Sequence, residues 1–259
     1  MGEKRVQTMN EKQMQMTGEM QARPTNETQR QPDPDKVPSG LRAQTGEAHE
    51  RSSTRVRTGA ALREAVAAFV PFNDQEAADK QVILHALDTN PRCFERNAQA
   101  HMACSIWVVD PKMEQTLLVY HNIYDSWSWI GGHADGEHDL QAVALRELQE
   151  ETGVGHARIV PCGPGNIYSL EVLTVSGHEK RAAYVSSHLH LNITYLAVAD
   201  PAEPIRVKPD ENSGVRWAPL EDAIRLSSEP WIRDRIYRKL IAKLEPLRRQ
   251  NAVSKPGAL

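Results

Sequence analysis

Three glutamates crowded on one side of a short helical segment constrain this chain more than any other feature of its sequence. Glu147, Glu150 and Glu151 are spaced i, i+3 and i+4, and on a helix such residues share one face. Like charges at this spacing repel by roughly 0.2–0.5 kcal/mol per pair even in water. They also lie near the C-terminal end of the segment, where the helix dipole disfavours negative charge. The crowding predicts a bound cation, against the simpler alternative of a solvated acidic helix end.

The residues before the glutamates indicate that this face is buried. Asp139 is the expected N-cap of the helix, and Gly153 is its stop signal. The positions that precede Glu147 on the same face are apolar: Leu140, Val143 and Ala144. Carboxylates that continue an apolar stripe need a partner or a metal, and oxygen-only ligands favour Mg²⁺ first and Mn²⁺ next. Arg146, which lies one turn before Glu150, can hold that side chain in place.

This segment resembles the Nudix box, the signature of the Nudix hydrolases. The box runs from a glycine through a first glutamate to an Arg-Glu pair, a Glu-Glu pair and a closing glycine followed by an aliphatic residue. The positions that match in register are Gly132, Arg146, Glu147, Leu148, Glu150, Glu151, Gly153 and Val154. The one departure is His138, which stands where the first glutamate belongs, directly after Glu137. A slip of the loop by a single residue would let Glu137 take that role.

The resemblance implies an α/β fold, an α/β/α sandwich with a mixed β-sheet between helices. It implies Mg²⁺-dependent hydrolysis of a diphosphate linkage in a nucleoside diphosphate derivative or related small phosphorylated metabolite, with Mn²⁺ as an alternative ion. The implied metal ligands are Glu147, Glu150 and Glu151, and Arg146 would orient them. Either Glu147 or Glu211, which precedes a predicted strand containing a tryptophan, would take the proton from the attacking water. Dimers are common in the family, which leaves a homodimer open.

Four further residues are candidates for contact with the substrate. Gly132 permits a tight turn and the close approach of a ligand, and His133 follows it. His188 and His190 alternate with apolar residues in a predicted strand, so they share one face. The alternatives are an ordinary loop histidine at position 133 and an ordinary polar sheet face at positions 188 and 190. A metal site at this pair would need a third ligand.

Two other functions fit parts of the pattern. A non-catalytic nucleotide sensor on the same fold would explain His138 in the glutamate position, although the complete set of later glutamates argues against it. An isopentenyl-diphosphate isomerase-like enzyme would need a cysteine in an Asn-Ser-Cys context. None of Cys93, Cys104 and Cys162 has that context, so the isomerase ranks below the sensor.

Composition divides the chain into three parts. No aromatic residue precedes Phe69, and residues 1–58 are expected to form a disordered polar tail. Residues 59–250 are expected to form the Nudix hydrolase domain with an N-terminal helical extension, and residues 251–259 a flexible C-terminal tail. The formal net charge of −3 provides no broad basic field for nucleic acid. The sequence contains no apolar run of about eighteen residues, so no membrane span is predicted.

Cysteine usage and the polar N-terminus predict a cytoplasmic location. The three cysteines are widely spaced and form no CxxC pair, so they indicate neither a disulfide framework nor a cysteine zinc site. The N-terminal residues lack the apolar core of a signal peptide.

Periodicity outlines the elements of the domain. Helices are expected over residues 60–69 and 75–87, with Ala77, Val82, Ile83 and Leu87 buried in the second, and a closing helix over 229–247. Strands are expected over residues 103–109, 116–120, 127–130, 158–160, 167–175, 188–197 and 215–219. Residues 176–180 are expected to form a turn.

Overall fold

The computed structural model describes residues 57–96, 99–180 and 183–253. All of these residues belong to the second of two compact units, which spans Glu50–Leu259. Residues 1–56 of the predicted N-terminal tail and residues 254–259 of the predicted C-terminal tail lie outside the described part.

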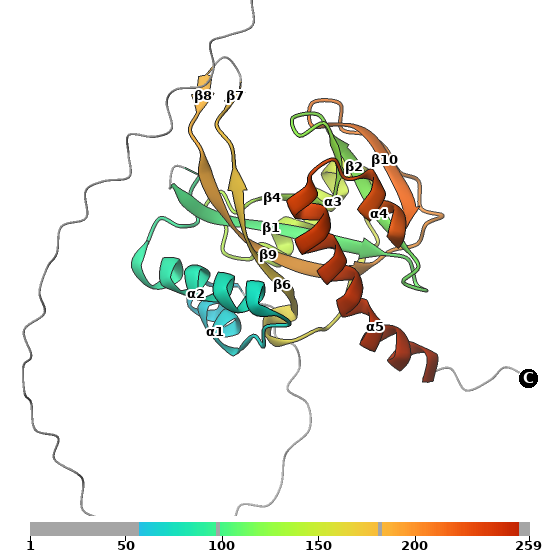
Figure 1. The fold of residues 1–259 in the computed structure, drawn as a ribbon, viewed down its shortest axis with the longest axis horizontal. Helices are drawn as coiled ribbons and strands as arrows, with labels where there is room; N and C mark the ends of the chain where they lie inside the picture. Colours follow the sequence, from blue (N-terminus) through green and yellow to red (C-terminus); the bar gives the residue numbers. More distant parts are fainter. Residues whose placement is uncertain (1–56, 97–98, 181–182, 254–259) are drawn as a thin grey trace, which may run out of the picture. The chain divides into compact units, whose positions relative to one another are not determined.

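A mixed sheet of eight strands forms the centre of the domain (Figure 1). Its main path runs in the order β10-β2-β1-β9-β5, while β3 pairs with β2, β4 with β1 and β6 with β9. The pairing of β1 with β9 is parallel, and the other pairings are antiparallel. The strands are β1 (Ala100–Val109), β2 (Gln115–His121), β3 (Ser126–Ser128), β4 (Ile130–His133), β5 (Arg158–Ile159), β6 (Ile167–Val175), β9 (His188–Val198) and β10 (Asn212–Pro219).

Helices pack on both faces of this sheet. Figure 1 shows α5 in front of the strands and the fainter α3 behind them. The helical elements are α1 (Gly59–Ala68), α2 (Asp74–Thr89), α3 (Leu140–Thr152), the short 3₁₀ turn η1 (Pro164–Asn166), α4 (Leu220–Leu226), the π-helical turn η2 (Ile232–Tyr237) and α5 (Arg238–Val253).

Alternation along β1 explains the layers. Met102, Cys104 and Ile106 point into one buried apolar cluster, which includes Val143 and Leu148 of α3. Trp107 and Val109 point the other way, into a cluster with Leu240 and Leu244 of α5. Because successive strand residues face opposite sides, one strand supplies both layers. The predicted α/β/α sandwich with a mixed sheet is confirmed.

The helix that carries the glutamates begins and ends where the sequence indicated. The side chain of Asp139 accepts a hydrogen bond from the Ala142 N–H at 3.0 Å, which caps the N-terminus of α3. Gly153 has φ of 84° and ends the helix in the left-handed conformation that glycine adopts without strain. These two ends fix which turn of α3 presents its carboxylates.

Several details of the predicted elements differ from the structure: α4 was not predicted, the closing helix extends to Val253, and Leu87 is only partly buried. Ala77 and Val82 of α2 are exposed, and the buried residues of this helix include Glu76 and Ala86 instead. Residues 176–180 are not simply a turn, because His178–Lys180 forms β7, which pairs with β8 (Ala183–Val185) in a separate two-stranded sheet. Strand β1 begins at Ala100, earlier than expected, which brings His101 into the main sheet.

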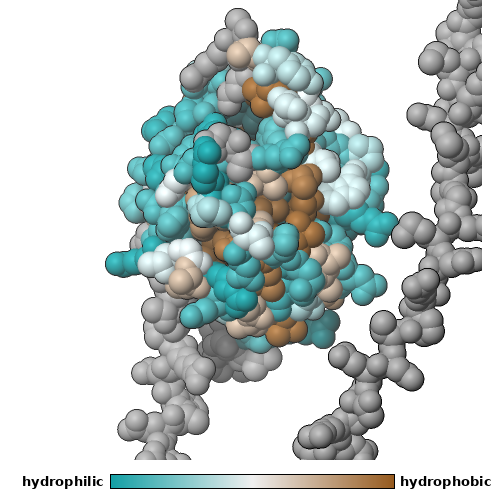
Figure 2. Space-filling model, turned by 90° about the vertical axis from the view of Figure 1, so that its left-hand side faces the viewer, coloured by the Kyte–Doolittle hydropathy of each residue, from teal (hydrophilic) through white to brown (hydrophobic). Residues whose placement is uncertain are grey.

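The surface and the helices agree with the polar composition. The face seen in Figure 2 is mainly hydrophilic, with smaller hydrophobic areas between the polar residues. Among the residues that the structure describes, no helix combines the length and the apolar character that crossing a bilayer requires.

Candidate metal and substrate site

Three carboxylates meet at the C-terminal end of α3. Each of Glu147, Glu151 and Glu211 offers an oxygen, and these oxygens all lie within 4.8 Å of one another. Glu147 and Glu151 lie one turn apart on α3, and Glu211 comes from the loop before β10. We call these three residues the acidic cluster.

Contacts with neighbouring segments of the same chain hold the acidic cluster in place. The side-chain amide of the fully buried Asn212 donates a hydrogen bond to the Glu151 carbonyl oxygen at 3.0 Å, which ties the Glu211 loop to α3. The Gly131 N–H donates to the Glu151 carboxylate. Gly132 lies against Glu147, and a Cβ at position 132 would be 2.5 Å from the Glu147 Cδ. Gly132 therefore lets the β4 backbone approach Glu147, whereas a Cβ at Gly131 would meet β1, 2.6 Å from the Cys104 carbonyl oxygen.

Burial and mutual repulsion favour the protonated forms of Glu147 and Glu151. Burial, followed by the charges of Glu147 and Glu211, raises the pKa of Glu151 to about 8. Burial, followed by the charges of Glu150 and Glu211, also raises the pKa of Glu147. A divalent cation would offset both effects, because carboxylates lose their mutual repulsion when they share a positive charge. The oxygen-only donor set, two members of it at least half-buried, fits Mg²⁺ or Mn²⁺.

Glu150 takes a different position from the other predicted metal ligands. Its carboxylate lies 3.2 Å from the Lys208 Nζ and 3.9 Å from the Arg146 Nε. Lys208 also reaches the Glu211 carboxylate at 3.1 Å. Although burial lowers the pKa of Lys208, its hydrogen bonds to Glu211 and Glu150 raise it above its usual value. The structure thus brings together Glu147, Glu151 and Glu211 and pairs Glu150 with two basic side chains.

Residues 137 and 138 have separate roles at the start of α3. The Glu137 carboxylate accepts hydrogen bonds from the His138 N–H at 2.8 Å and the Asp139 N–H at 3.1 Å. These N–H groups, together with the charges of His138 and Arg146, lower the pKa of Glu137. The His138 ring packs against Phe94, with ring centroids 4.2 Å apart. Glu137 therefore supports the loop beside Arg146, and His138 packs against an aromatic side chain.

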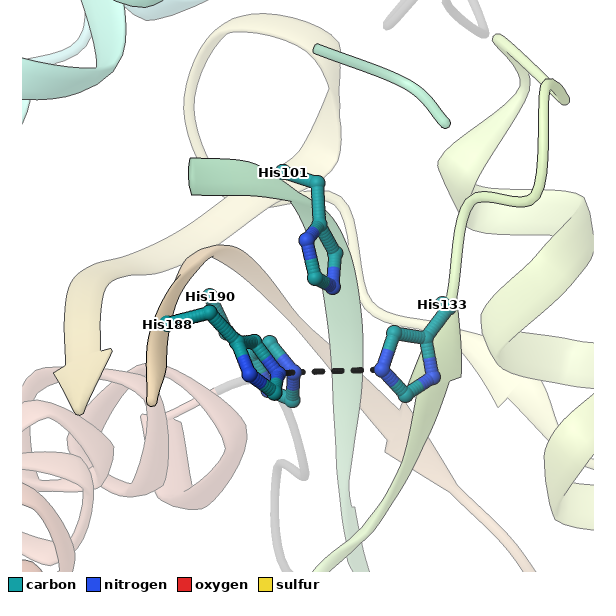
Figure 3. A group of neighbouring side chains, drawn as sticks. All are labelled: His101, His133, His188 and His190. Carbon is teal, nitrogen blue, oxygen red and sulfur yellow. Dashed lines mark hydrogen bonds between the residues drawn. The ribbon is translucent and has the colours of Figure 1, made fainter. Parts of the chain in front are cut away.

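The predicted substrate histidines meet in a second group. Each of His101, His133, His188 and His190 offers a ring nitrogen, and these nitrogens all lie within 4.8 Å of one another (Figure 3). We call these residues the histidine cluster. The Nε2 of His190 lies 3.1 Å from the Nε2 of His133 and 3.1 Å from the Nε2 of His188. Burial, followed by the charges of His133 and His101, lowers the pKa of His190 to about 2.

Two adjoining cavities run along this side of the sheet. The larger, about 520 Å³, is lined by the histidine cluster together with Arg96, Tyr124 and His178, among others. The smaller, about 150 Å³, is lined by Gly131, Gly132, His133 and His190, among others. His133 and His190 thus border both cavities, beside the glycines that pack on the acidic cluster.

Sequence reasoning missed two residues of this region, His101 of the histidine cluster and Lys208 beside the acidic cluster. His101 carries no motif, and only the parallel pairing of β1 with β9, which places it opposite His190, brings it to the histidine cluster. Lys208 precedes the predicted Glu211 by one turn's spacing, which was a usable signal, because the two form an i,i+3 ion pair.

Similarity to known proteins extends over the whole sheet and both sites. The family model described as NUDIX domain matches residues 99–240, more than half of the chain. No curated protein matches the chain. Several solved structures do.

Three of these structures illustrate the match. An Ap4A hydrolase from C. elegans is 20% identical, with a TM-score of 0.40, and the alignment covers 56% of this chain and 96% of that one. A NUDIX family hydrolase from Clostridium perfringens is 17% identical, with a TM-score of 0.41, over 57% of this chain and 97% of that one. The NUDIX domain of Shewanella oneidensis NrtR, solved with ADP ribose, is 18% identical, with a TM-score of 0.40, and the alignment covers 63% of this chain and 96% of that one.

The family assignment rests on the match of the family model, which spans β1 to the start of α5 and includes the glycines, α3 and the Glu211 loop. It agrees with the mixed sheet between helices and with the box that precedes and forms α3. The chain belongs to the Nudix family of pyrophosphohydrolases.

Proposed function

We propose that the protein hydrolyses a diphosphate linkage in a nucleoside diphosphate derivative or a related small phosphorylated metabolite, and that the reaction depends on Mg²⁺, with Mn²⁺ as a substitute. The observation that carries this proposal is the convergence of the Glu147, Glu151 and Glu211 carboxylates within 4.8 Å. Hard divalent cations bind such oxygen groups. When bound, Mg²⁺ would neutralise the diphosphate oxygens and lower the pKa of a water molecule.

Glu151, Glu150 and Arg146 would have different roles at the metal site. Glu151 is the more buried helical ligand, and its hydrogen bond from the Gly131 N–H fixes its orientation. Glu150 would join the ligands by leaving Lys208, so we place it at the edge of the site. Arg146 is a positioning residue, because it lies beside Glu150 and its charge acts on Glu137.

The proton from the attacking water would pass to a carboxylate. Glu147 is our first choice, because it packs against Gly132, beside which we place the diphosphate. Glu211 is the second choice, because its carboxylate belongs to the acidic cluster and is held there by an ion pair with Lys208. The water oxygen would form a new bond to phosphorus, and the bond from phosphorus to the bridging oxygen would break and release phosphate or a nucleoside phosphate.

The cavities offer a place for the rest of the substrate. We place the diphosphate near Gly132, where the lack of a side chain leaves room, and the remainder in the larger cavity of about 520 Å³. His133, His188 and His190 line that cavity, which supports their predicted contact with the substrate side of the site. A small-molecule partner follows, and a homodimer stays a prediction.

Cysteine chemistry of the isomerase kind finds no support here. Cys93 and Cys104 are buried. Burial raises the pKa of Cys162 to about 12, so its reactive thiolate is rare at neutral pH.

A panel of nucleoside diphosphate derivatives with Mg²⁺, Mn²⁺ or a chelator tests the proposal. We expect phosphate-containing products with either metal and none with the chelator. Glu151→Gln should abolish turnover while the substrate still binds, and Glu64→Gln, on the exposed face of α1, should behave as wild type. If wild-type protein binds nucleotides but releases no product with any metal, the domain is a sensor and the catalytic proposal fails.

A further inference from the structure

The four histidines of the histidine cluster come from three strands of the main sheet. His101 lies on β1, His133 ends β4, and His188 and His190 begin β9. Figure 3 shows their rings turned toward a common centre. His101 is buried and the other three are half-buried, so a ligand at this centre would be largely shielded from solvent.

The contacts of His190 exceed what one imidazole nitrogen can satisfy. Its Nε2 lies 3.1 Å from the Nε2 of both His133 and His188. A neutral imidazole nitrogen carries either one proton or one lone pair, so it forms a single good hydrogen bond. Three ring nitrogens with lone pairs directed at a shared cation would account for both short distances.

Two of the nitrogen separations are close to those of tetrahedral coordination. With Zn–N bonds of about 2.0–2.1 Å, neighbouring nitrogens of a tetrahedron lie about 3.3–3.4 Å apart. The two distances of 3.1 Å are within a few tenths of an ångström of this value.

A neighbouring carbonyl orients one ligand. The Nδ1 of His188 lies 2.9 Å from the Ser186 carbonyl oxygen, an acceptor, so the Nδ1 carries the proton. The lone pair is then on the Nε2, which faces His190. Metal-binding histidines commonly donate their other N–H to a backbone carbonyl in this way.

From these contacts we propose that the histidine cluster binds one transition-metal ion, with Zn²⁺ preferred, at a site separate from the acidic cluster. Imidazole nitrogens suit zinc, copper and nickel, whereas Mg²⁺ prefers oxygen. The nearby Arg96 guanidinium would oppose a cation, but it is paired with the Asp135 carboxylate. The ligands in this proposal are His133, His188 and His190. Because these residues line the larger cavity, the bound metal would face it.

A bound ion would join the two sites mechanically. His133 directly follows Gly132, and Gly132 packs against Glu147 of the acidic cluster. The ion would tie the end of β4 to the start of β9, so we expect it to raise the melting temperature of the protein. This inference does not depend on the proposed hydrolysis, because metal binding is measured without substrate.

The test is a titration of the full-length protein with Zn²⁺. The protein is first stripped with a chelator and then kept in excess Mg²⁺, which prefers oxygen ligands. Calorimetry should show one tight Zn²⁺ per chain, and Co²⁺ should give the visible absorption of tetrahedral nitrogen coordination. His190→Gln should weaken Zn²⁺ binding by at least about 100-fold, the upper end of what loss of a mere supporting contact causes.

Three variants make the result decisive. His188→Gln, at a half-buried position, should also weaken Zn²⁺ binding by at least about 100-fold, and it decides the question if His190→Gln does not fold. His178→Gln, which changes a histidine of the same cavity outside the cluster, should keep wild-type affinity. Glu151→Gln should also keep it. The proposal is overturned if tight Zn²⁺ binding survives both cluster variants, is lost with Glu151→Gln, or is absent from the wild type.

Discussion

Gly132 and Glu147 are packed so closely that no side chain fits between them. A Cβ at position 132 would lie 2.5 Å from the Glu147 Cδ and 2.6 Å from its Oε1. Glu147 is half-buried, and its carboxylate would have to move to make room for a side chain at position 132. The glycine of the box therefore serves the carboxylate across from it as well as the turn of the backbone.

We expect Gly132→Ala to lower kcat/KM by at least about tenfold, because displacement of a catalytic group by a fraction of an ångström is costly. Overpacking should reduce the free energy of unfolding by about 1–3 kcal/mol. Steady-state kinetics and urea denaturation measure the two effects. Gly155→Ala is the matched control, because a Cβ there would meet nothing closer than 3.7 Å. Equal activity of the two variants would contradict the prediction that a side chain at position 132 displaces the Glu147 carboxylate.

Glu151 should make the metal-free protein less stable as pH rises. Its pKa is about 8 in the folded protein and near 4.5 when unfolded. The stabilisation from the neutral carboxyl is present below the unfolded pKa and is lost as pH rises from about 4.5 to about 8. Without divalent metal, Glu151→Gln should therefore exceed wild type in stability at pH 8, by roughly 1–4 kcal/mol, and show a smaller decline across this range.

Urea denaturation in a chelator at several pH values measures this difference, and added Mg²⁺ reverses its sign, because only wild type keeps the full ligand set. Glu64→Gln, at an exposed position, controls for the loss of one charge. Parallel pH curves for wild type and Glu151→Gln would show that the carboxyl is not held protonated.

Glu137 should matter more for catalysis than His138. Its carboxylate accepts two backbone hydrogen bonds and interacts with the charge of Arg146. Glu137→Gln should reduce kcat/KM severalfold. The reason is that Arg146, which lies beside Glu150, then loses the charge of Glu137 that helps to hold it in position. His138→Gln should mainly lower stability, by about 0.5–1.5 kcal/mol, through loss of its ring contact with Phe94. Kinetics and thermal melting of both variants test the ranking, and a larger kinetic defect in His138→Gln would reverse it.

A buried ion network joins α2, β6 and α5. The Lys239 Nζ lies 2.9 Å from the Glu171 carboxylate and 3.5 Å from that of Glu76, and all three side chains are at most 2% exposed. Lys239→Met leaves buried carboxylates short of a cation, so we expect a loss of about 3–5 kcal/mol in urea denaturation. Arg63→Met, which breaks the exposed ion pair with Asp88, should leave the free energy of unfolding nearly unchanged. Similar losses would mean that the network is not the stabilising element.

The exposed faces of α2 show where local pattern fails. Apolar spacing predicted that Val82 is buried, yet its side chain is 42% exposed, whereas Glu76 is fully buried. The reason lies in partners far along the chain, because Lys243 and Ser169 bond the Glu76 carboxylate. A carboxylate is stable in the interior only where hydrogen-bond or ionic partners surround it. These partners are distant in sequence, so no local pattern reveals them.

The sequence alone determined the helix of the box and its ends, because caps, spacing and the left-handed glycine are local properties. It also indicated most of the strands, through alternation. Only the tertiary structure decided which carboxylates share a centre. Lys208 pairs with Glu150, while Glu211 joins Glu147 and Glu151. It also brought His101 opposite His190, because the pairing of β1 with β9 joins distant segments. Sites built across strands depend on register, which is set by the packing of the whole sheet.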